Sequence, residues 1–388
     1  MAADVNKKKK VLLVDQIGHK TYEYDYSACR YLINEYDMTC YMSDNTPRNV
    51  DTTGFRVEYG FHDVYSGNKI AKTIKYIRAL SEMWAFIKEN HFDIIHLQWY
   101  ELALYQKFYI KALRRLCKPA PRIVMTVHGI MPWRNGFFRH FERQLAYLEA
   151  DAILLHSEPA LEQFNKCFRS KCPKYVITSA FRDEADYVPM DKREARRMLG
   201  LPEDKTIILS FGTIREDKTI DLLFKAFPQA YKKNPNLFLL SGGTLNVREK
   251  DYYKALAEKC RETGSARIDF DYIDKTLEPA YYSAADILVV PYSYISQSGV
   301  AYCGLLYNLP MIASDIPRLD LMAKKRINAE IFEKGSVEQL VRKILDLSAD
   351  PEKMKRYSEG SKHLRESDFS IHRRVAMTKS AYRELFTR

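Results

Sequence analysis

Residues 286–315 constrain the fold of this chain more than any other stretch of the sequence. A short apolar run at 287–290 ends at Pro291, and small or polar residues follow it. An apolar segment at 300–307 then leads into a second apolar run at 311–313. Such short apolar runs are typical of parallel strands that are buried on both faces, and the segment between them is long enough for about two helical turns. We therefore predict a strand–loop–helix–strand unit of a parallel sheet.

The start of the predicted helix favours an anion. In such a unit the helix begins at the carboxyl edge of the sheet, with free backbone N–H groups and the positive end of its dipole. Gln297, Ser298, Gly299 and Val300 occupy this position, and a glycine lets a phosphate approach the backbone closely. The stretch therefore predicts an anion site.

The same alternation of strands and helices fills the rest of the chain. Apolar runs predict strands at 11–14, 39–42, 55–58, 93–99, 122–127, 152–155, 206–211, 237–241 and 268–270. Helical patterns occupy 22–36, 70–88, 101–116, 137–148, 220–231, 252–263, 278–284, 337–347 and 371–386. This order predicts α/β domains with parallel sheets.

The chain divides in the middle. Over residues 178–205 the periodicity lapses, charge rises, and Pro189 and Pro202 interrupt the sequence, as expected of a linker. At 388 residues the chain also exceeds the usual size of one hydrophobic core. We predict a first domain at 1–180, a second at 181–370, and a C-terminal helix at 371–388 that could cross back to the first domain. Ligands in such sheets bind outside the carboxyl ends of the strands.

Composition excludes several classes of protein. The hydrophobic fraction is 46%, and no run approaches the 18 apolar residues of a spanning helix. The basic residues 7–10 are followed by an apolar run too short for a signal peptide. The seven cysteines lack CxxC spacing, which favours thiols in a reducing cytoplasm. We therefore expect a cytoplasmic protein.

The net charge of +11 predicts a basic surface, which suits nucleic acid, an anionic membrane or an anionic substrate. No RNA-binding aromatic signature, zinc finger or helix-turn-helix supports nucleic acid. Lys107, Lys111, Arg114 and Lys118 form one basic stripe on the helix at 101–116. A solvated face is the favoured interpretation, and a peripheral contact with anionic lipid is the alternative.

Two cations follow the first strand of the second domain. Gly212 ends this strand, and Arg215 and Lys218 come after it. Arg215 would bind a diphosphate as a fork and Lys218 as a point charge. The alternative is a surface ion pair of Arg215 with Glu216 or Asp217. The nearby anion site favours the diphosphate.

Polar residues also follow strands of the first domain. Gly18 lies in the turn after the first strand, which suits either a ligand-binding edge or a simple tight turn. His96, His128 and His156 lie at the ends of three strands, but no carboxylate spacing supports a zinc site. In the second domain, an Asp-x-Asp at 269–271 would suit a divalent cation, although loop polarity is the favoured explanation.

Sequence motifs at these positions resemble those of retaining glycosyltransferases of the GT-B fold, in family 4 (group 1). In the second domain the motifs are Phe211-Gly212-x-x-Arg215-x-x-Lys218, Ser283-Ala-Ala-Asp286-Ile-Leu-Val-Val-Pro291-Tyr292, Gln297-Ser298-Gly299-Val300 and Pro310-Met-Ile-Ala-Ser-Asp315. In the first domain, the segments similar to that family's acceptor-side strands are Asp93-Ile-Ile-His96, Thr126-Val-His128-Gly-Ile-Met-Pro132 and Ala150-Asp-Ala-Ile-Leu-Leu-His156-Ser157.

The resemblance implies two Rossmann-like parallel-sheet domains that face each other across a cleft. It also implies transfer of a sugar with retention of configuration and without a metal ion. Arg215 and Lys218 would hold the donor diphosphate, and His128 would lie beside the reacting sugar. The remaining implied contacts are Gly212, Tyr272, Ile273, Gln297, Ser298, Gly299 and Val300 for the donor, and Gly18 and His96 on the acceptor side.

The sequence departs from the family pattern in two respects. The family usually carries two glutamates eight positions apart, and these positions hold Ile295 and Cys303 here. The commoner position of the arginine, directly after the glycine, holds Thr213, and Arg215 follows it. These departures leave the diphosphate contacts in place but leave the contacts to the donor sugar and to the ribose unassigned.

We therefore predict a glycosyltransferase of glycan or polysaccharide biosynthesis, a hexosyltransferase that uses a UDP- or GDP-sugar and no cofactor. Its acceptor would be a saccharide or a lipid-linked saccharide. An anionic membrane surface is a further expected partner, with the protein peripheral on the inner face, and nucleic acid is not expected. Two alternatives stay open. A nucleotide-sugar epimerase of the same fold would need acidic groups for proton transfer. A non-catalytic sugar-nucleotide-binding protein would fit the missing glutamates.

Overall fold

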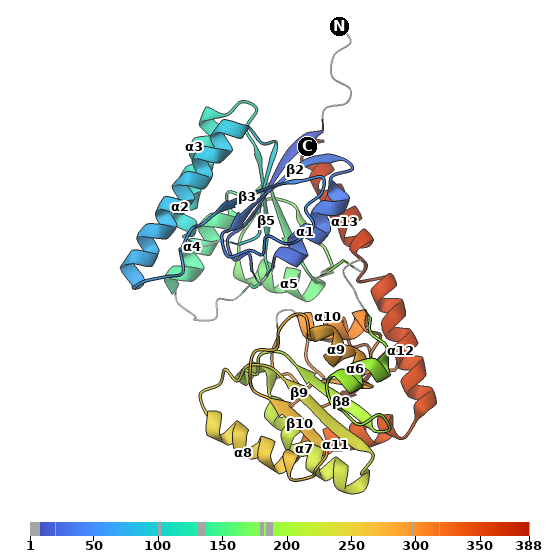
Figure 1. Ribbon diagram of the computed structural model, residues 1–388. Coiled ribbons are helices and arrows are strands. Elements are labelled where there is room, and N and C mark those ends of the chain that lie inside the picture. Colours follow the sequence, from blue (N-terminus) through green and yellow to red (C-terminus); the bar gives the residue numbers. More distant parts are fainter. Residues whose placement is uncertain are drawn as a thin grey trace. The chain divides into compact units, whose positions relative to one another are not determined.

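The chain forms two compact units. A computed structural model describes residues 8–19, 21–99, 102–130, 137–178, 182–183, 189–295, 298–317 and 319–387. Unit 1 contains Met1–Asp183 and Phe369–Arg388, and unit 2 contains Glu184–Asp368. Each unit is built on one parallel sheet (Figure 1).

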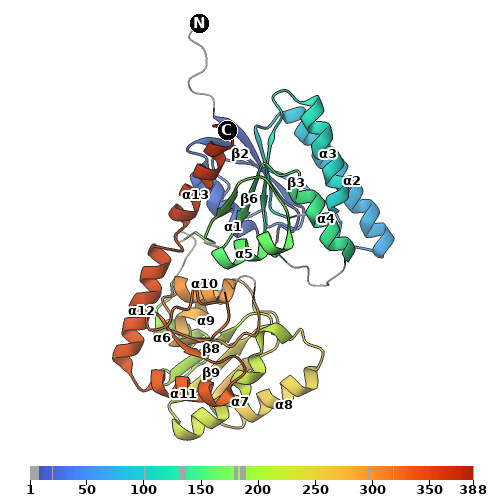
Figure 2. The ribbon, with the colours of Figure 1, turned by 180° about the vertical axis from the view of Figure 1, so that it is seen from behind.

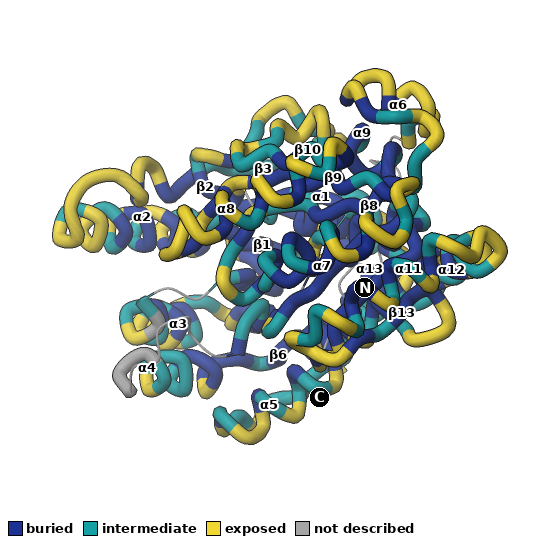
Figure 3. The backbone as a smooth tube through the Cα atoms, turned by 90° about the horizontal axis from the view of Figure 1, so that it is seen from below, coloured by how far each residue is buried: buried dark blue, intermediate teal, exposed yellow. Residues whose placement is uncertain are grey.

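Unit 1 has a seven-stranded sheet in the order β3-β2-β1-β4-β5-β6-β7. The strands are β1 (Lys9–Asp15), β2 (Tyr36–Ser43), β3 (Arg56–Gly60), β4 (Ile94–Leu97), β5 (Arg122–Thr126), β6 (Ala152–Leu155) and β7 (Lys174–Val176). The central strands are buried on both faces, because helices cover both sides of a parallel sheet. Figure 3 shows this burial, in contrast to the exposed outer turns of helix α2.

The helices of unit 1 lie on both faces of its sheet. They are α1 (Tyr22–Leu32), α2 (Lys69–Asn90), α3 (Ala103–Leu116), α4 (Phe137–Tyr147), α5 (Glu158–Cys167) and α13 (Ile371–Glu384). Figures 1 and 2 show α1 and α13 on one face and α2, α3 and α4 on the other. From β1 the chain adds strands in one direction as far as β3, and from β4 it adds them in the opposite direction as far as β7. With right-handed crossovers, this reversal places the connecting helices of the two halves on opposite faces of the sheet.

The C-terminal helix α13 is part of the core of unit 1. The Arg374 guanidinium lies over the Tyr24 ring at 3.3 Å from its centroid and donates a hydrogen bond of 2.6 Å to the Tyr24 carbonyl. Tyr382 is fully buried, and its ring contacts the Tyr36 ring edge-on. These contacts anchor α13 to α1 and β2.

Unit 2 has a six-stranded parallel sheet in the order β10-β9-β8-β11-β12-β13. The strands are β8 (Thr206–Phe211), β9 (Leu237–Gly242), β10 (Ala266–Asp269), β11 (Ile287–Val290), β12 (Met311–Ser314) and β13 (Ala329–Phe332). The helices are α6 (Lys192–Met198), α7 (Ile220–Lys233), α8 (Lys250–Arg261), α9 (Glu278–Ala284), α10 (Gly299–Leu306), α11 (Val337–Ser348) and α12 (Pro351–Glu366). Helix α7 packs against α8 and α11, while α9 packs against α6, and α10 against α12.

The structure differs from the sequence-based expectation in several places. The helix predicted over 22–36 ends at Leu32, and Tyr36 already begins β2. The linker predicted over 178–205 contains α6, which is stabilised because Asp191 caps its first turn and because Ala195 and Arg196 are buried. Helices α5 and α12 and strands β7 and β13 were not predicted either. In the described residues, none of the helices has the length and apolar character needed to cross a membrane.

A buried carboxylate joins the last strand of unit 2 to two helices. Glu330 of β13 accepts hydrogen bonds from Lys343 of α11 at 2.6 Å and from Tyr357 of α12 at 2.9 Å, and it pairs with Lys353. Burial alone would raise the pKa of Glu330, but the hydrogen bonds from Lys343, Lys353 and Tyr357 lower it to about 2. The carboxylate therefore stabilises the fold in its charged form.

We expect Glu330→Gln to lower the free energy of unfolding by about 2 to 3 kcal/mol at pH 7. Because the folded-state pKa lies below the unfolded value, this stabilisation is complete above pH 4.5 and is lost as the pH falls toward about 2. Urea unfolding at several pH values measures both effects. Glu359→Gln on the exposed side of α12 is the control, and an equal loss in both variants would contradict the prediction.

Candidate active site

The carboxyl edge of the unit 2 sheet brings Gly212, Lys218 and the first turn of α10 together. Gly212 follows β8 with a φ of +86°, a conformation that favours glycine. A Cβ atom at this position would lie 3.3 Å from Val300 Cγ2 and 3.4 Å from Lys218 Nζ. Gly212 therefore keeps open the space between the lysine and the helix.

A second glycine brings the next loop against this one. Gly243 follows β9 with a φ of +148°, and a Cβ there would lie 2.2 Å from the Gly212 carbonyl oxygen. The Gly212 N–H donates to the Gly242 carbonyl at 2.8 Å. At Gly212 and Gly243 the backbones of the two loops thus touch directly, and further along the Arg248 N–H donates to the Glu216 carboxylate at 2.8 Å. The Gly242-Gly243 pair at the end of a strand was a visible signal for this contact, but the sequence analysis did not assign it to the site.

Lys218 is a buried cation. Only 9% of the residue is exposed, and in the described part of the chain its ammonium has no hydrogen bond or ion pair. The Tyr292 ring lies beside it, with its centroid 5.8 Å from Nζ. Burial and, to a smaller extent, the Arg215 charge together lower the pKa of Lys218 to about 8, against the opposing effect of Asp217. An ammonium in this environment is stabilised by an incoming anion.

Arg215 forms the ion pair that was the alternative interpretation of the sequence. Its Nε and Nη2 donate to the two carboxylate oxygens of Asp217 at 3.0 and 2.9 Å. The Asp217 backbone carbonyl in turn accepts from the backbone N–H and the hydroxyl of Ser293, in the loop after β11. Arg215 therefore lies at the same sheet edge as Lys218. Its contact with a diphosphate stays a prediction.

The first turn of α10 keeps backbone donors available. Ser298 is buried and caps the helix by accepting a hydrogen bond from the Ala301 N–H at 3.0 Å. The N–H groups of Gly299 and Val300 belong to the first turn, where a helix has no internal acceptors for them. Gln297, which we predicted to contact the donor, lies outside the described residues.

The two remaining donor-side residues differ in position. Ile273 is half-buried, and a Cβ on Gly242 would lie 3.2 Å from its Cγ1, so Ile273 borders the same edge. Tyr272 is 72% exposed. Asp269 of the Asp-x-Asp accepts hydrogen bonds from Arg267 at 2.9 Å and from Tyr281 at 2.8 Å, which is a structural role. Within the described residues, no three His, Cys, Asp or Glu side chains cluster as metal ligands.

In unit 1, His128 lies in a chain of hydrogen bonds at the carboxyl edge of the sheet. Its Nε2 lies 2.9 Å from Gln98 Oε1, its Nδ1 lies 3.3 Å from His156 Nε2, and its ring stacks on Trp99. Burial lowers the pKa of His156 to about 4, so this ring is neutral at pH 7. Its Nδ1–H donates to the Ile177 carbonyl, which can only accept.

The two acceptor-side predictions fall at different places in unit 1. Gly18 has a φ of +61°, and a Cβ there would lie 2.1 Å from Thr46 Oγ1, so the turn after β1 requires glycine. His96 is buried, and its two ring nitrogens lie 2.6 Å from the Tyr382 hydroxyl and 2.7 Å from Thr126 Oγ1. Burial lowers the pKa of His96 to about 3. This geometry makes His96 a link between β4, β5 and α13, and its acceptor-side role stays a prediction.

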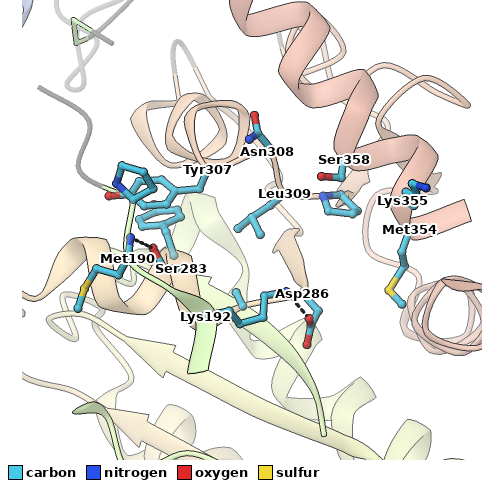
Figure 4. A pocket seen from close by; sticks show the side chains of 14 residues that line it. Met190, Lys192, Ser283, Asp286, Tyr307, Asn308, Leu309, Met354, Lys355 and Ser358 are labelled. Carbon is cyan, nitrogen blue, oxygen red and sulfur yellow. Dashed lines mark hydrogen bonds and ion pairs between the residues drawn. The ribbon is translucent and has the colours of Figure 1, made fainter. Parts of the chain in front are cut away.

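A cavity of about 390 Å³ in unit 2 lies at the opposite edge of the sheet (Figure 4). Asp286 and Leu309 line it, and they precede β11 and β12. The Asp286 carboxylate is engaged there, because it pairs with Lys192 and with Arg196, each at 2.7 Å. This cavity is therefore separate from the edge that carries Gly212.

Comparisons with known structures identify the fold. Sucrose-phosphate synthase from Thermosynechococcus elongatus aligns with a TM-score of 0.76 at 18% identity, covering 98% of this chain and 100% of that chain. The Anabaena protein HepE, solved in complex with UDP and glucose, also gives 0.76, at 16% identity and the same coverage. Together with the two parallel sheets, this likeness defines a GT-B fold, as the sequence motifs implied.

The chain belongs to the group 1 glycosyltransferases: residues 191–364 match the family Glycosyl transferases group 1, and residues 26–179 match Glycosyltransferase Family 4. Among curated proteins, the D-inositol 3-phosphate glycosyltransferase of Kribbella flavida is 21% identical over 320 residues, which cover 76% of this chain and 72% of that protein. The chain is thus a glycosyltransferase, as the sequence analysis predicted.

We expect Gly212→Ala to disturb the site beyond its effect on stability. The positive φ alone costs about 1 kcal/mol of unfolding free energy, and the new methyl group also presses on Val300 and Lys218. Gly200→Ala is the matched control, because Gly200 has a φ of +61° but nothing within 4 Å of its Cβ position. Urea unfolding should show similar losses in both variants, whereas sugar-transfer turnover should fall only in Gly212→Ala. Equal turnover in the two variants would contradict the prediction that a methyl group at position 212 disturbs the site.

Proposed function

We propose that this glycosyltransferase takes its sugar from a nucleoside-diphosphate donor bound by unit 2 and delivers it to an acceptor bound by unit 1. The observation that carries the proposal is the buried ammonium of Lys218, which has no anionic partner in the described residues and lies beside Gly212 and the first turn of α10. A cation buried without a partner costs folding free energy, and a bound diphosphate compensates for it.

The same groups support the chemical step. As the bond between the sugar and the diphosphate breaks, negative charge grows on the leaving diphosphate. Lys218 and the N–H groups of Gly299 and Val300 are fixed donors at the edge where this charge develops. Arg215 supplies a second positive charge, held in place by Asp217. We propose that no metal ion is needed, because these groups neutralise the charge.

For the donor we propose a UDP-sugar, with a GDP-sugar as the alternative. The support is the likeness of the fold to HepE, which was solved with UDP and glucose. For the acceptor we propose a saccharide or a lipid-linked saccharide, in glycan biosynthesis. His128 would orient the transferred sugar, since its hydrogen bonds to Gln98 and His156 fix its ring. Retention of configuration follows the family resemblance.

We also propose a peripheral membrane contact, and we base it on exposed apolar side chains of α3 instead of its basic residues. Lys107, Lys111 and Arg114 of α3 approach Glu149, at 3.8, 3.8 and 3.9 Å, while Lys111 and Lys118 stay exposed, as a solvated face requires. The outer side of α3 also exposes Phe108 and Leu116. A protein on the cytoplasmic face of a membrane would use these apolar side chains, and flotation with anionic vesicles tests this contact.

The geometry weighs against the epimerase, and an assay separates the second alternative, a binding protein, from the proposed function. An epimerase needs acidic groups for proton transfer beside the sugar, but Asp217 is paired with Arg215, and Asp269 with Arg267 and Tyr281. A binding protein without activity would bind UDP yet release no nucleotide from any sugar donor. A turnover assay over several nucleotide sugars therefore decides between these functions.

We expect Lys218→Ala to lower kcat/KM by about a hundredfold or more, because it removes the buried charge that stabilises the leaving group. It should also abolish the rise in melting temperature that UDP causes. The stability of the free protein should not fall, because the buried ammonium is itself unfavourable. Lys259→Ala, an exposed lysine of α8, is the control. Near-normal turnover of Lys218→Ala would refute the proposal that Lys218 binds the donor diphosphate.

We expect the reaction to continue in EDTA and to keep the anomeric configuration of the donor. The physical reason is that protein cations replace a metal at the diphosphate. A single NMR experiment, run with and without EDTA, follows the rate and identifies the anomer of the product. Loss of activity with EDTA, restored by Mg²⁺ or Mn²⁺, would refute metal independence, and an inverted product would refute retention.

A further inference from the structure

The ring of Tyr24 connects the C-terminal helix to the histidines at the carboxyl edge of the unit 1 sheet. Tyr24 belongs to α1 and is buried. Its ring contacts the rings of His128 and His156 edge-on, with centroids 5.4 and 5.8 Å away. The two histidine rings lie 5.0 Å from each other. Because a protein interior is close-packed, a displacement of the Tyr24 ring would displace the histidine rings as well.

Arg374 of α13 holds Tyr24 at two points. Its guanidinium lies over the Tyr24 ring, 3.3 Å from the centroid, where a cation is attracted by the electrons of the ring face. Its Nη1 also donates a hydrogen bond of 2.6 Å to the Tyr24 carbonyl. Only 3% of Arg374 is exposed. Both the ring and the backbone of Tyr24 are therefore fixed by one buried side chain.

An arginine is more than the packing of α13 requires. The helix has apolar anchors at Ile371, Val375 and Tyr382, which are all buried. An apolar side chain at position 374 would add to them without the cost of burying a charge. The charge of Arg374 also reaches the histidines. Burial lowers the pKa of His156 to about 4 against the effect of its backbone hydrogen bond, and the Arg374 charge adds to the lowering.

We propose that Arg374 and Tyr24 are positioning residues of the sugar-transfer step, and that they act by fixing the ring of His128. This inference rests on the proposed function, in which His128 orients the transferred sugar. It adds to the acceptor side of unit 1 a residue of the C-terminal helix, which lies 350 positions from Tyr24 in the sequence. Arg374 acts through Tyr24 and touches neither substrate.

The first test is the NMR spectrum of the histidine rings, which requires no substrate. The signal of His128 is assigned as the one that is missing in His128→Ala. Arg374→Met should shift or broaden this signal, because the Tyr24 ring is no longer held in one position. Arg374→Lys keeps a cation over the ring and should restore most of the wild-type signal. Arg373→Met, at an exposed neighbour on α13, is the control and should leave the signal unchanged.

The second test is a double-mutant cycle on the release of UDP from UDP-glucose. Arg374→Met and His128→Ala should each lower kcat by about tenfold or more, since a misplaced group loses most of its effect on the reaction. The double variant should be as active as His128→Ala within about twofold, because the arginine acts through the histidine. The KM for UDP-glucose should stay unchanged, since the proposed donor contacts lie in unit 2.

Two variants of Tyr24 serve if Arg374→Met does not fold. Tyr24→Phe keeps the ring and should keep the turnover, whereas Tyr24→Leu removes the ring and should lower kcat about as much as Arg374→Met. Equal turnover in these two variants would overturn the role of the ring.

The outcomes separate this inference from the proposed function. An unchanged His128 signal in folded Arg374→Met, or losses of kcat that multiply in the double variant, would overturn the inference while the phosphate site in unit 2 stands. Wild-type turnover in His128→Ala would instead refute the proposed role of His128. If the wild type releases no UDP from UDP-glucose, the proposed donor is wrong, and the NMR test by itself decides on Arg374.

Discussion

The buried positive charge of Lys218 is the constraint on which the site in unit 2 depends. An ammonium that is nearly excluded from water destabilises the fold unless an anion accompanies it, and burial accordingly lowers its pKa to about 8. In the described residues the protein supplies no anion to its Nζ, although Asp217 lies nearby and is bound to Arg215. The folded protein therefore holds an unfavourable charge at a place where a ligand can neutralise it.

Backbone geometry makes this charge accessible. The positive φ angles of Gly212 and Gly243 let the backbones of two loops touch at these glycines, and the space above Gly212 opens between Lys218 and Val300. Any Cβ at Gly212 would occupy part of this space, and one at Gly243 would collide with the Gly212 backbone. Gly212 and Gly243 thus provide the space through which a ligand can reach Lys218. The helix start at Gly299 adds donors to it without adding a side chain that could block the ligand.

Most of the fold was predictable because buried parallel strands leave a clear apolar signal, as at 206–211 and 287–290. The missed elements lack that signal. Strand β7 has three half-buried residues at the sheet edge, and the basic helix α6 has few apolar positions. At the candidate site, the proximity of Gly212, Lys218 and the first turn of α10 was predictable from their order along the chain, whereas their contacts with a donor stay a prediction. The contact of Glu278 with Cys303 joins residues 25 positions apart, and no local pattern indicates it.

The distribution of charge at this edge argues for one orientation of the donor. Lys218 and the start of α10 attract phosphate, whereas the carboxylate of Glu278 on α9, which lies beside Cys303 of α10, repels it. A nucleoside diphosphate placed the other way round would set its phosphates against a carboxylate and its ribose against a buried ammonium. Both contacts would be unfavourable. The separation of these two charges on either side of the start of α10 therefore favours the proposed orientation, in which Lys218 would hold the diphosphate.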